Sequence, residues 1–395
     1  MKRVGRLEAR LVREVLESEF RSSKSVGMLA RAEQAFSELL GVEHSIGCVN
    51  GTATLHIALE ALGVGAGDEV IVPSLTMSAT CFSVLQANAT PIFADVDRDT
   101  WQIDPESVRS LISSRTKAIM TVALYGGSPD YSRLLEVAGP IPLIEDNAEA
   151  LGATYDGRPL GSFGTFSSYS FQASKHLSAG EGGMICTNDS LLAEEARLVQ
   201  TLGYAAVRNS STRKIPKSVI QNPAYLRHES LGWNYRMPEI TAAVVLGQVT
   251  RAAELLAPRL RAARAIEEVI TSTPWLKPQR HYPQVASSYW AMGATLERDD
   301  VSWETFTQTF RKHGGKGIYA AWALGYQEPA FQNLSLLGRE QFLTRPASEL
   351  FAPGTTPVAE TLQRKILAFR TNEWSSSGLR TQVRALEMTL HELRR

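Results

Sequence analysis

One lysine lies in a sequence context that favours covalent chemistry. Lysine is scarce in this chain, with 10 residues against 31 arginines, and Lys175 lies in the small, polar segment 172–182 between two strand-like runs. An amine partly removed from water can act as a nucleophile, a Schiff-base former and a proton carrier. Taken alone, however, a solvated loop lysine is the more common explanation.

Two further segments carry polar groups at the ends of predicted strands. Asp146 follows an apolar run, where a carboxylate could hold a protonated ring nitrogen through a charge-assisted hydrogen bond. Gly51 and Thr52 begin a helix directly after a strand-like segment, and the free N–H groups of such a first turn bind anions, most naturally a phosphate. Each feature alone has an ordinary explanation, as a solvated acid or a helix cap.

The three features are complementary when they are read together. Pyridoxal 5′-phosphate requires a phosphate cradle, an acidic partner for its ring nitrogen and a lysine that forms a Schiff base. Their order along the chain, first the Gly-Thr helix, then the strand-end acid and then the loop lysine, also suits an α/β protein. The sequence therefore predicts a pyridoxal phosphate site around Gly51, Asp146 and Lys175.

The elements that would position these residues alternate in type. Short apolar runs and helical stretches follow one another over 69–73, 78–86, 91–94, 105–112, 118–122 and 142–145. This alternation is typical of a doubly wound α/β domain with a mostly parallel sheet. In such sheets ligands bind at the carboxyl ends of the strands, where Asp146 is expected.

The remaining pattern predicts two domains. Two amphipathic helices are expected within residues 1–40, and a long helix is predicted from 240 to about 269. Beyond this helix the strand signals become sparser. We expect a large domain over 1–255 and a smaller C-terminal α/β domain over 256–395, hinged on the long helix.

The composition excludes partners held by bulk charge. The chain has 41 basic and 41 acidic residues, whereas a nucleic-acid or anionic-membrane binder would carry a basic excess. No run of about 18 apolar residues occurs, so we expect no membrane partner and a cytoplasmic protein. Cys48, Cys81 and Cys186 have apolar neighbours and are expected in the core, not in a disulfide framework or a metal site.

Seven motifs extend this interpretation along most of the chain. In order they are Asn50–Leu59, Asp68–Ser74 with Thr76, Ala79 and Thr80, Ala89–Asp97, Glu145–Gly152, Ser170–Phe171 with Lys175, Gly180–Gly183, and Leu231–Met237. This set resembles the DegT/DnrJ/EryC1/StrS family of pyridoxal-phosphate sugar aminotransferases. The similarity is strong to about Gln248 and weak after it. It implies the type I fold of aspartate aminotransferases, an α/β fold whose large domain has a mixed, mostly parallel seven-stranded sheet.

The resemblance implies roles for three residues near the ring of the cofactor. Lys175 would form the Schiff base and later move a proton between the substrate carbon and the cofactor. Asp146 would keep the pyridine nitrogen protonated, so that the ring can accept electrons. Glu149 stands where the family often has Gln, His or Glu beside the ring hydroxyl oxygen.

The resemblance also implies how the phosphate is held. The expected contacts are Gly51, the backbone amides of Thr52 and Ala53, and Ser170. Asn234 would reach the phosphate from a neighbouring subunit, which implies a homodimer with shared active sites. Without this resemblance, Asn234 and Arg236 would be read as capping or surface residues; Arg236 is kept as a substrate-contact candidate.

Two departures from the family pattern concern contacts with the cofactor and the substrate. Met77 stands where an aromatic residue usually stacks on the pyridine ring, and a thioether can still pack on a ring face. The segment 314–331 replaces the usual Gly-Ile stretch that leads to a proline-and-histidine segment. Tyr319 and Trp322 in this segment are candidate substrate contacts, although aromatic residues more often pack in cores.

The function implied is transfer of an amino group from L-glutamate or L-glutamine to a keto-sugar, in family members usually a nucleotide-linked hexose. The cofactor would alternate between its pyridoxal and pyridoxamine phosphate forms in aminosugar biosynthesis. A first alternative is a keto-cyclitol or a keto-sugar without a nucleotide, because the altered segment 314–331 helps to shape the substrate pocket. A second is a non-catalytic regulator, against which the joint presence of Lys175, Asp146 and the phosphate segment argues.

Overall fold

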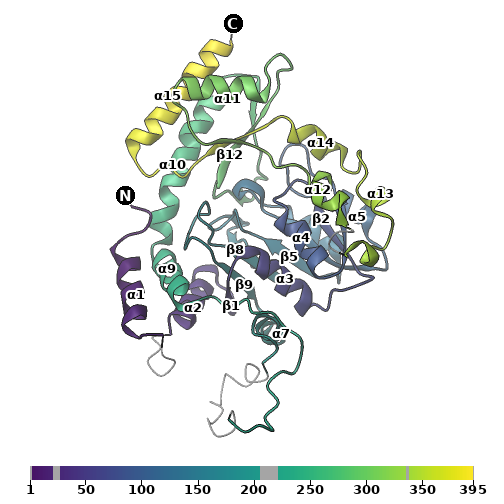
Figure 1. The fold of residues 1–395 in the computed structure, drawn as a ribbon. Coiled ribbons are helices and arrows are strands. Elements are labelled where there is room, and N and C mark those ends of the chain that lie inside the picture. The colour runs from purple at the N-terminus through teal and green to yellow at the C-terminus, as the bar shows by residue number, and fades with distance from the viewer. Residues whose placement is uncertain (1, 21–26, 205–220, 335–337, 395) are drawn as a thin grey trace.

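A seven-stranded sheet forms the centre of the computed structural model, which describes residues 2–20, 27–204, 221–334 and 338–394 (Figure 1). The strand order is β1-β9-β8-β5-β4-β2-β3. The bounds are β1 His44–Cys48, β2 Glu69–Pro73, β3 Thr90–Ala94, β4 Thr116–Val122, β5 Leu143–Asp146, β8 Phe166–Ser170 and β9 Gly183–Thr187. Neighbouring strands from β3 to β8 are parallel, and β9 is antiparallel to both β8 and β1. The predicted mixed, mostly parallel sheet is thus confirmed.

The sequence of these strands explains their position in the core. β2 is fully buried, with Val70, Ile71 and Val72 all inaccessible to solvent. A parallel sheet is covered on both faces, so its strands are continuous apolar runs instead of alternating ones. β5 ends at Asp146, and this places a carboxylate at the carboxyl edge of the sheet.

Helices cover this sheet and connect its strands. They are α3 Gly51–Ala61, α4 Ala79–Gln86, α5 Pro105–Leu111, α6 Tyr131–Ala138 and α7 Ser190–Gln200. Local signals start several of them, since the side chains of Asp104, Asp130 and Asp189 accept hydrogen bonds from first-turn N–H groups. These caps fix the starts of the helices that follow β3, β4 and β9.

The predicted long helix after residue 240 is in fact two helices. α9 (Glu239–Thr250) and α10 (Ala252–Ile270) meet at Arg251 at an angle of 66°. No glycine or proline marks this position. Arg251 instead pairs with Glu254 and with the buried Glu8, so tertiary contacts accompany a break that the periodic pattern does not show.

The two N-terminal helices are found as predicted. α1 (Arg6–Glu17) and α2 (Met28–Leu40) pack against α9, and Figure 1 shows all three on one side of the large sheet. Their apolar side chains form one core cluster with residues of β8 and β9. No single helix of the described chain is long and apolar enough to span a membrane; α9 and α10 meet that criterion only as a bent pair. All three cysteines are buried, as expected.

A second sheet lies towards the C-terminal end of the chain (Figure 1). Its order is β10-β12-β14-β13, with bounds β10 Leu276–Pro278, β12 Ala291–Leu296, β13 Ile318–Ala320 and β14 Ile366–Arg370. It shares a core with α10, α11 (Trp303–Lys312) and α15 (Ser376–Leu393). A third, small sheet consists of β6 Thr154–Tyr155, β7 Arg158–Pro159 and β11 Val285–Ala286.

The C-terminal part of the chain also contributes to the core of the large sheet. Three short helices, α12 Pro329–Gln332, α13 Ala347–Leu350 and α14 Pro357–Gln363, lie beside α4 and α5 in Figure 1. Phe331 and Phe351 belong to the same core cluster as β2 and β4. The division at residue 255 stays a prediction, because residues after it pack in both cores.

Candidate active site

A cavity of about 870 Å³ lies where the carboxyl ends of the large sheet meet the second sheet. It is lined from one side by residues at the ends of β4, β5 and β8 and at the start of α3, and from the other by residues of β12, β13 and β14. Cavities of this size, placed at strand ends, commonly hold small ligands. The predicted residues that line it are Gly51, Thr52, Met77, Asp146, Glu149, Ser170, Lys175, Tyr319 and Trp322.

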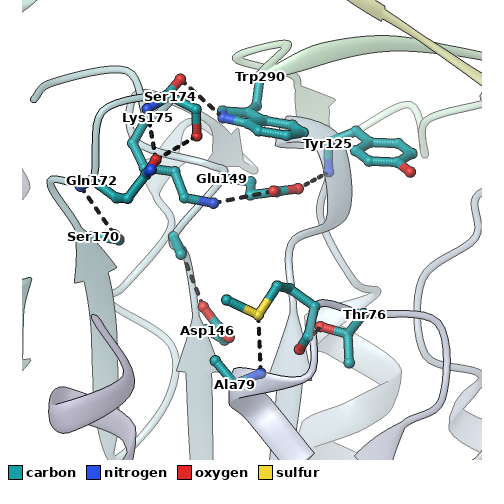
Figure 2. A network of polar contacts seen from close by, with 12 residues as sticks. Thr76, Ala79, Tyr125, Asp146, Glu149, Ser170, Gln172, Ser174, Lys175 and Trp290 are labelled. Carbon is teal, nitrogen blue, oxygen red and sulfur yellow. Dashed lines mark hydrogen bonds and ion pairs between the residues drawn. The ribbon is translucent and has the colours of Figure 1, made fainter. Parts of the chain in front are cut away.

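Lys175 is directed into this cavity and is held by an acid. Its Nζ lies 3.2 Å from Oε1 of Glu149, and the two side chains are only 13% and 6% exposed. The other oxygen of Glu149 accepts the N–H of Tyr125 at 3.1 Å (Figure 2). The Lys175 amine also lies 4.9 Å from the ring centroid of Trp290, within the range of a cation–π contact. Lys175 is thus a partly desolvated amine with a fixed direction, as its sequence context predicts.

Glu149 shows how strongly this part of the cavity is desolvated. Burial raises its pKa above the ordinary value, while the neighbouring charge of Lys175 acts in the opposite direction. Tyr125, which donates its N–H to Glu149, has a positive φ of 58° although it is not a glycine. The surrounding contacts must hold this uncommon conformation, because it is unfavourable for a bulky side chain.

Asp146 is a buried carboxylate with two fixed donors. Thr80 donates its hydroxyl to Oδ2 at 2.8 Å, and the N–H of Ala148 donates to Oδ1 at 3.1 Å. Desolvation raises the pKa of Asp146, and these hydrogen bonds oppose the shift. A buried acid in this setting can hold a cationic partner, such as a protonated ring nitrogen, that lies in the same cavity.

Replacing Thr80 with valine tests how Asp146 is held. We expect the variant to lose about 1–3 kcal/mol of unfolding free energy, because a buried carboxylate loses a hydroxyl donor while the side-chain shape is kept. Thr80→Ser retains a hydroxyl and should recover most of the loss. Denaturant unfolding of wild-type protein and both variants measures the effect, and equal stability of Thr80→Val and wild type would show that the contact contributes nothing.

The first turn of α3 is the place where the sequence predicts an anion site. Asn50 caps the helix, and its side chain accepts the N–H of Ala53 at 2.8 Å. A Cβ added to Gly51 would lie 3.0 Å from the Cβ of Ser170, so glycine permits the close approach of β8 to this helix. Gly51, Thr52 and Ser170 border the cavity, whereas Ala53 is buried beside it with its N–H already bound.

Two predicted residues lie outside the cavity of their own chain. Asn234 and Arg236 are exposed and lie in 221–238, a described stretch that contains no helix or strand. Their backbones form isolated bridges with Thr201 and Cys48. The described chain therefore does not bring these two side chains to Lys175.

Met77 and the aromatic candidates all contribute to the cavity wall. Met77 is 44% exposed, and its sulfur accepts the N–H of Ala79 at 3.1 Å. Trp322 packs with Trp290 and Tyr125 at centroid distances of 6.0 and 6.1 Å. The resulting wall is aromatic and apolar, a surface that suits the faces of a ring-shaped ligand.

Several residues of the site have no signal in the local sequence. Trp290 donates its indole N–H to the carbonyl of Ser174 from 116 positions away in the chain. Arg259, in the middle of α10, also bonds the backbone of the lysine loop. Only the fold brings these residues together, and the helical pattern around Arg259 is consistent with an ordinary amphipathic helix.

The residues present fit pyridoxal phosphate. A primary amine, a buried carboxylate with fixed donors and the free N–H groups at the start of α3 surround one cavity. These are the groups that bind the aldehyde carbon, the ring nitrogen and the phosphate of this cofactor. Figure 2 shows Lys175 and Glu149 on one side of this space and Asp146 on the other.

Comparison with known proteins agrees with this geometry. The chain is 44% identical over 240 residues to GDP-perosamine synthase of Caulobacter vibrioides. This alignment covers 60% of this chain and 60% of that protein. It is 39% identical over 236 residues to a pleiotropic regulatory protein of Geobacillus stearothermophilus, covering 58% of this chain and 59% of that protein. These alignments therefore span about three-fifths of the curated relatives.

A solved structure extends the likeness over the whole chain. The aminotransferase from Psychrobacter cryohalolentis matches with a TM-score of 0.87 and 28% identity, covering 99% of this chain and 98% of that one. The predicted type I fold is thereby confirmed. The sequence profile of the family also matches residues 3–343. The chain therefore belongs to the DegT/DnrJ/EryC1/StrS aminotransferase family.

Proposed function

We propose that this protein is a pyridoxal-phosphate aminotransferase that moves an amino group from L-glutamate or L-glutamine to a nucleotide-linked keto-hexose. The observation that carries the proposal is the convergence of Lys175, Asp146 and the start of α3 on one cavity. The relative named GDP-perosamine synthase supports the sugar class, and it makes GDP the first nucleotide to test. Aminosugar biosynthesis is the proposed context.

When bound, the cofactor supplies an electron sink and carries the amino group between the two substrates. Lys175 would hold the aldehyde carbon of the cofactor, and its amine would carry the proton at the reacting substrate carbon. Asp146 holds the ring nitrogen protonated by a charge-assisted hydrogen bond. Glu149 keeps the Lys175 amine directed into the cavity, since the two lie 3.2 Å apart.

The start of α3 and the wall of the cavity would position the cofactor and the substrate. Gly51 and Thr52 offer backbone N–H groups to the phosphate, and Ser170 adds a hydroxyl at the end of β8. The N–H of Ala53 donates to the side chain of Asn50, so this amide takes part in the helix cap that shapes the turn. Tyr319 and Trp322 are the proposed substrate contacts, and Met77 is proposed to pack against the ring.

A second copy of the chain would complete the site. Asn234 and Arg236 are exposed and lie outside the cavity of their own chain. Leu226, Leu231 and Trp233, in the same segment, expose apolar side chains, a feature typical of interaction surfaces. We therefore propose a homodimer in which Asn234 of each subunit reaches the phosphate in the other, with Arg236 nearby.

A sequential absorbance experiment tests the activity. Purified protein is loaded with pyridoxal phosphate and treated with L-glutamate, which should remove the absorbance of the lysine-bound cofactor. A GDP-linked 4-keto-hexose should restore this absorbance, and free GDP should slow the recovery by competition. Failure of the wild-type protein to take up the cofactor would contradict the proposal.

The same experiment separates the alternatives. Recovery with a keto-cyclitol, unaffected by GDP, would assign the protein to substrates without a nucleotide. Stable cofactor binding with no reaction with any amino donor would favour the regulatory role that the name of the Geobacillus relative suggests. The presence of both Lys175 and Asp146 at the cavity favours catalysis over that role.

A further inference from the structure

Arg259 is a charged side chain in the middle of the structure. It lies in α10 and is 1% exposed, which places it among the largest fully buried side chains. Its guanidinium forms no ion pair with any residue in the described parts of the chain; its hydrogen-bond partners are all neutral. Burying a charge without an opposite charge is unfavourable, so the position calls for an explanation beyond packing.

The contacts of Arg259 divide between two parts of the molecule. Nη2 donates to the carbonyls of Ser174 at 2.7 Å and Lys175 at 3.1 Å. Nη1 donates to the carbonyl of Trp290 at 3.1 Å and to the hydroxyl of Thr371 at 3.1 Å. One rigid, planar group therefore joins the lysine loop to the segments next to β12 and β14.

The same contacts fix the backbone from which the Lys175 side chain extends. The guanidinium bonds the carbonyls of Ser174 and Lys175, which lie on either side of the Lys175 Cα. The indole of Trp290 also donates to the carbonyl of Ser174, at 3.2 Å. The ring of Trp290 in turn packs on the Lys175 amine. Burial, together with the nearby positive charge of Arg3, lowers the pKa of Arg259 to about 9, and the charge of Glu149 acts in the opposite direction.

We propose that Arg259 is a positioning residue, which aligns Lys175 for attachment to the cofactor by fixing its backbone to the second sheet. This inference rests on the proposed function, because it concerns the same lysine. Arg3 also donates to the carbonyls of Ala173 and Lys175, so the loop keeps some support when Arg259 is changed. We therefore expect a misdirected amine instead of an unfolded loop.

Two readouts on Arg259→Met separate positioning from general stability. Pyridoxine 5′-phosphate has no aldehyde and cannot bond to lysine, so its affinity reports the phosphate and ring contacts alone. Attachment of pyridoxal phosphate replaces the aldehyde oxygen with the Lys175 nitrogen and releases water, and absorbance and borohydride trapping follow its rate. We expect attachment at least about tenfold slower, because small misplacements of a reacting group are costly, with unchanged affinity for the analogue.

Matched variants control this comparison. Arg261→Met makes the same change at an exposed position of α10 and should behave as wild type. Arg259→Lys keeps the charge but loses the planar fork, so it should fold and still attach the cofactor more slowly than wild type. If Arg259→Met does not fold, the lysine variant decides the question by the same two measurements.

Each result supports or overturns the inference. Slow attachment with intact binding of the analogue supports it. Attachment at the wild-type rate, or a parallel fall in attachment and analogue affinity, overturns it, and the parallel fall assigns Arg259 a packing role. If wild-type protein itself does not attach pyridoxal phosphate, the proposed function fails, and this outcome is distinct from both.

Discussion

Lys175→Ala is expected to abolish covalent attachment of pyridoxal phosphate and to lower the transamination rate by about 1000-fold or more, because the variant lacks both the attaching amine and the proton carrier. The structure supports this role, since Lys175 is the lysine that lines the cavity in the described chain and lies 3.2 Å from Glu149. The absorbance of the loaded protein and mass spectrometry after borohydride reduction measure attachment. Steady-state kinetics measure the rate.

An exposed lysine and the buried partner of Lys175 provide the controls for this variant. Lys117→Ala removes an exposed lysine of β4 and should change neither attachment nor rate. Lys175→Ala leaves Glu149 as an unpaired buried acid, so its stability must be measured separately. Adding Glu149→Gln should recover lost stability without recovering attachment. A borohydride-stable adduct on another lysine of the Lys175→Ala protein would show that the assignment of Lys175 is incorrect.

The sequence predicted the parts of the site that depend on local segments. Asp146 ends a strand and Gly51 begins a helix, and both positions can be read from an apolar run followed by polar or small residues. Lys175 is recognisable because its flanking strands are short and regular. Each of these residues needs only its own element to reach the edge of the sheet, where parallel topology brings the strand ends together.

The remaining parts depend on contacts between distant segments. The hydrogen bonds that hold the Lys175 loop involve Trp290 and Arg259, which come later in the chain than all strands of the large sheet. The break at Arg251 likewise coincides with a pairing to Glu8 near the N-terminus, and no residue nearby disrupts the helical pattern. Periodicity reports which face of a helix is buried, but not which partner it meets.

Asp146→Asn is expected to stabilise the protein when no cofactor is present. Desolvation is the largest cause of the raised pKa of Asp146, so the ionised carboxylate is disfavoured in the folded state. With a folded pKa above the unfolded one, its contribution to stability is fully present below the ordinary pKa and is lost as the pH rises through the raised value. At neutral pH the amide avoids this loss. It can accept the N–H of Ala148 and donate to the hydroxyl oxygen of Thr80.

The same substitution should impair the loaded enzyme, because the amide carries no charge to hold the ring nitrogen protonated. We expect a gain of about 0.5–2 kcal/mol in unfolding free energy without cofactor, and a fall of about 100- to 1000-fold in transamination rate. Denaturant unfolding between acidic and neutral pH should show the gain growing as the pH rises, alongside steady-state kinetics. Asp156→Asn, in an exposed turn, serves as the control. A less stable cofactor-free variant would contradict the predicted cost of the buried charge, and wild-type activity would contradict the role of Asp146 in holding the ring nitrogen protonated.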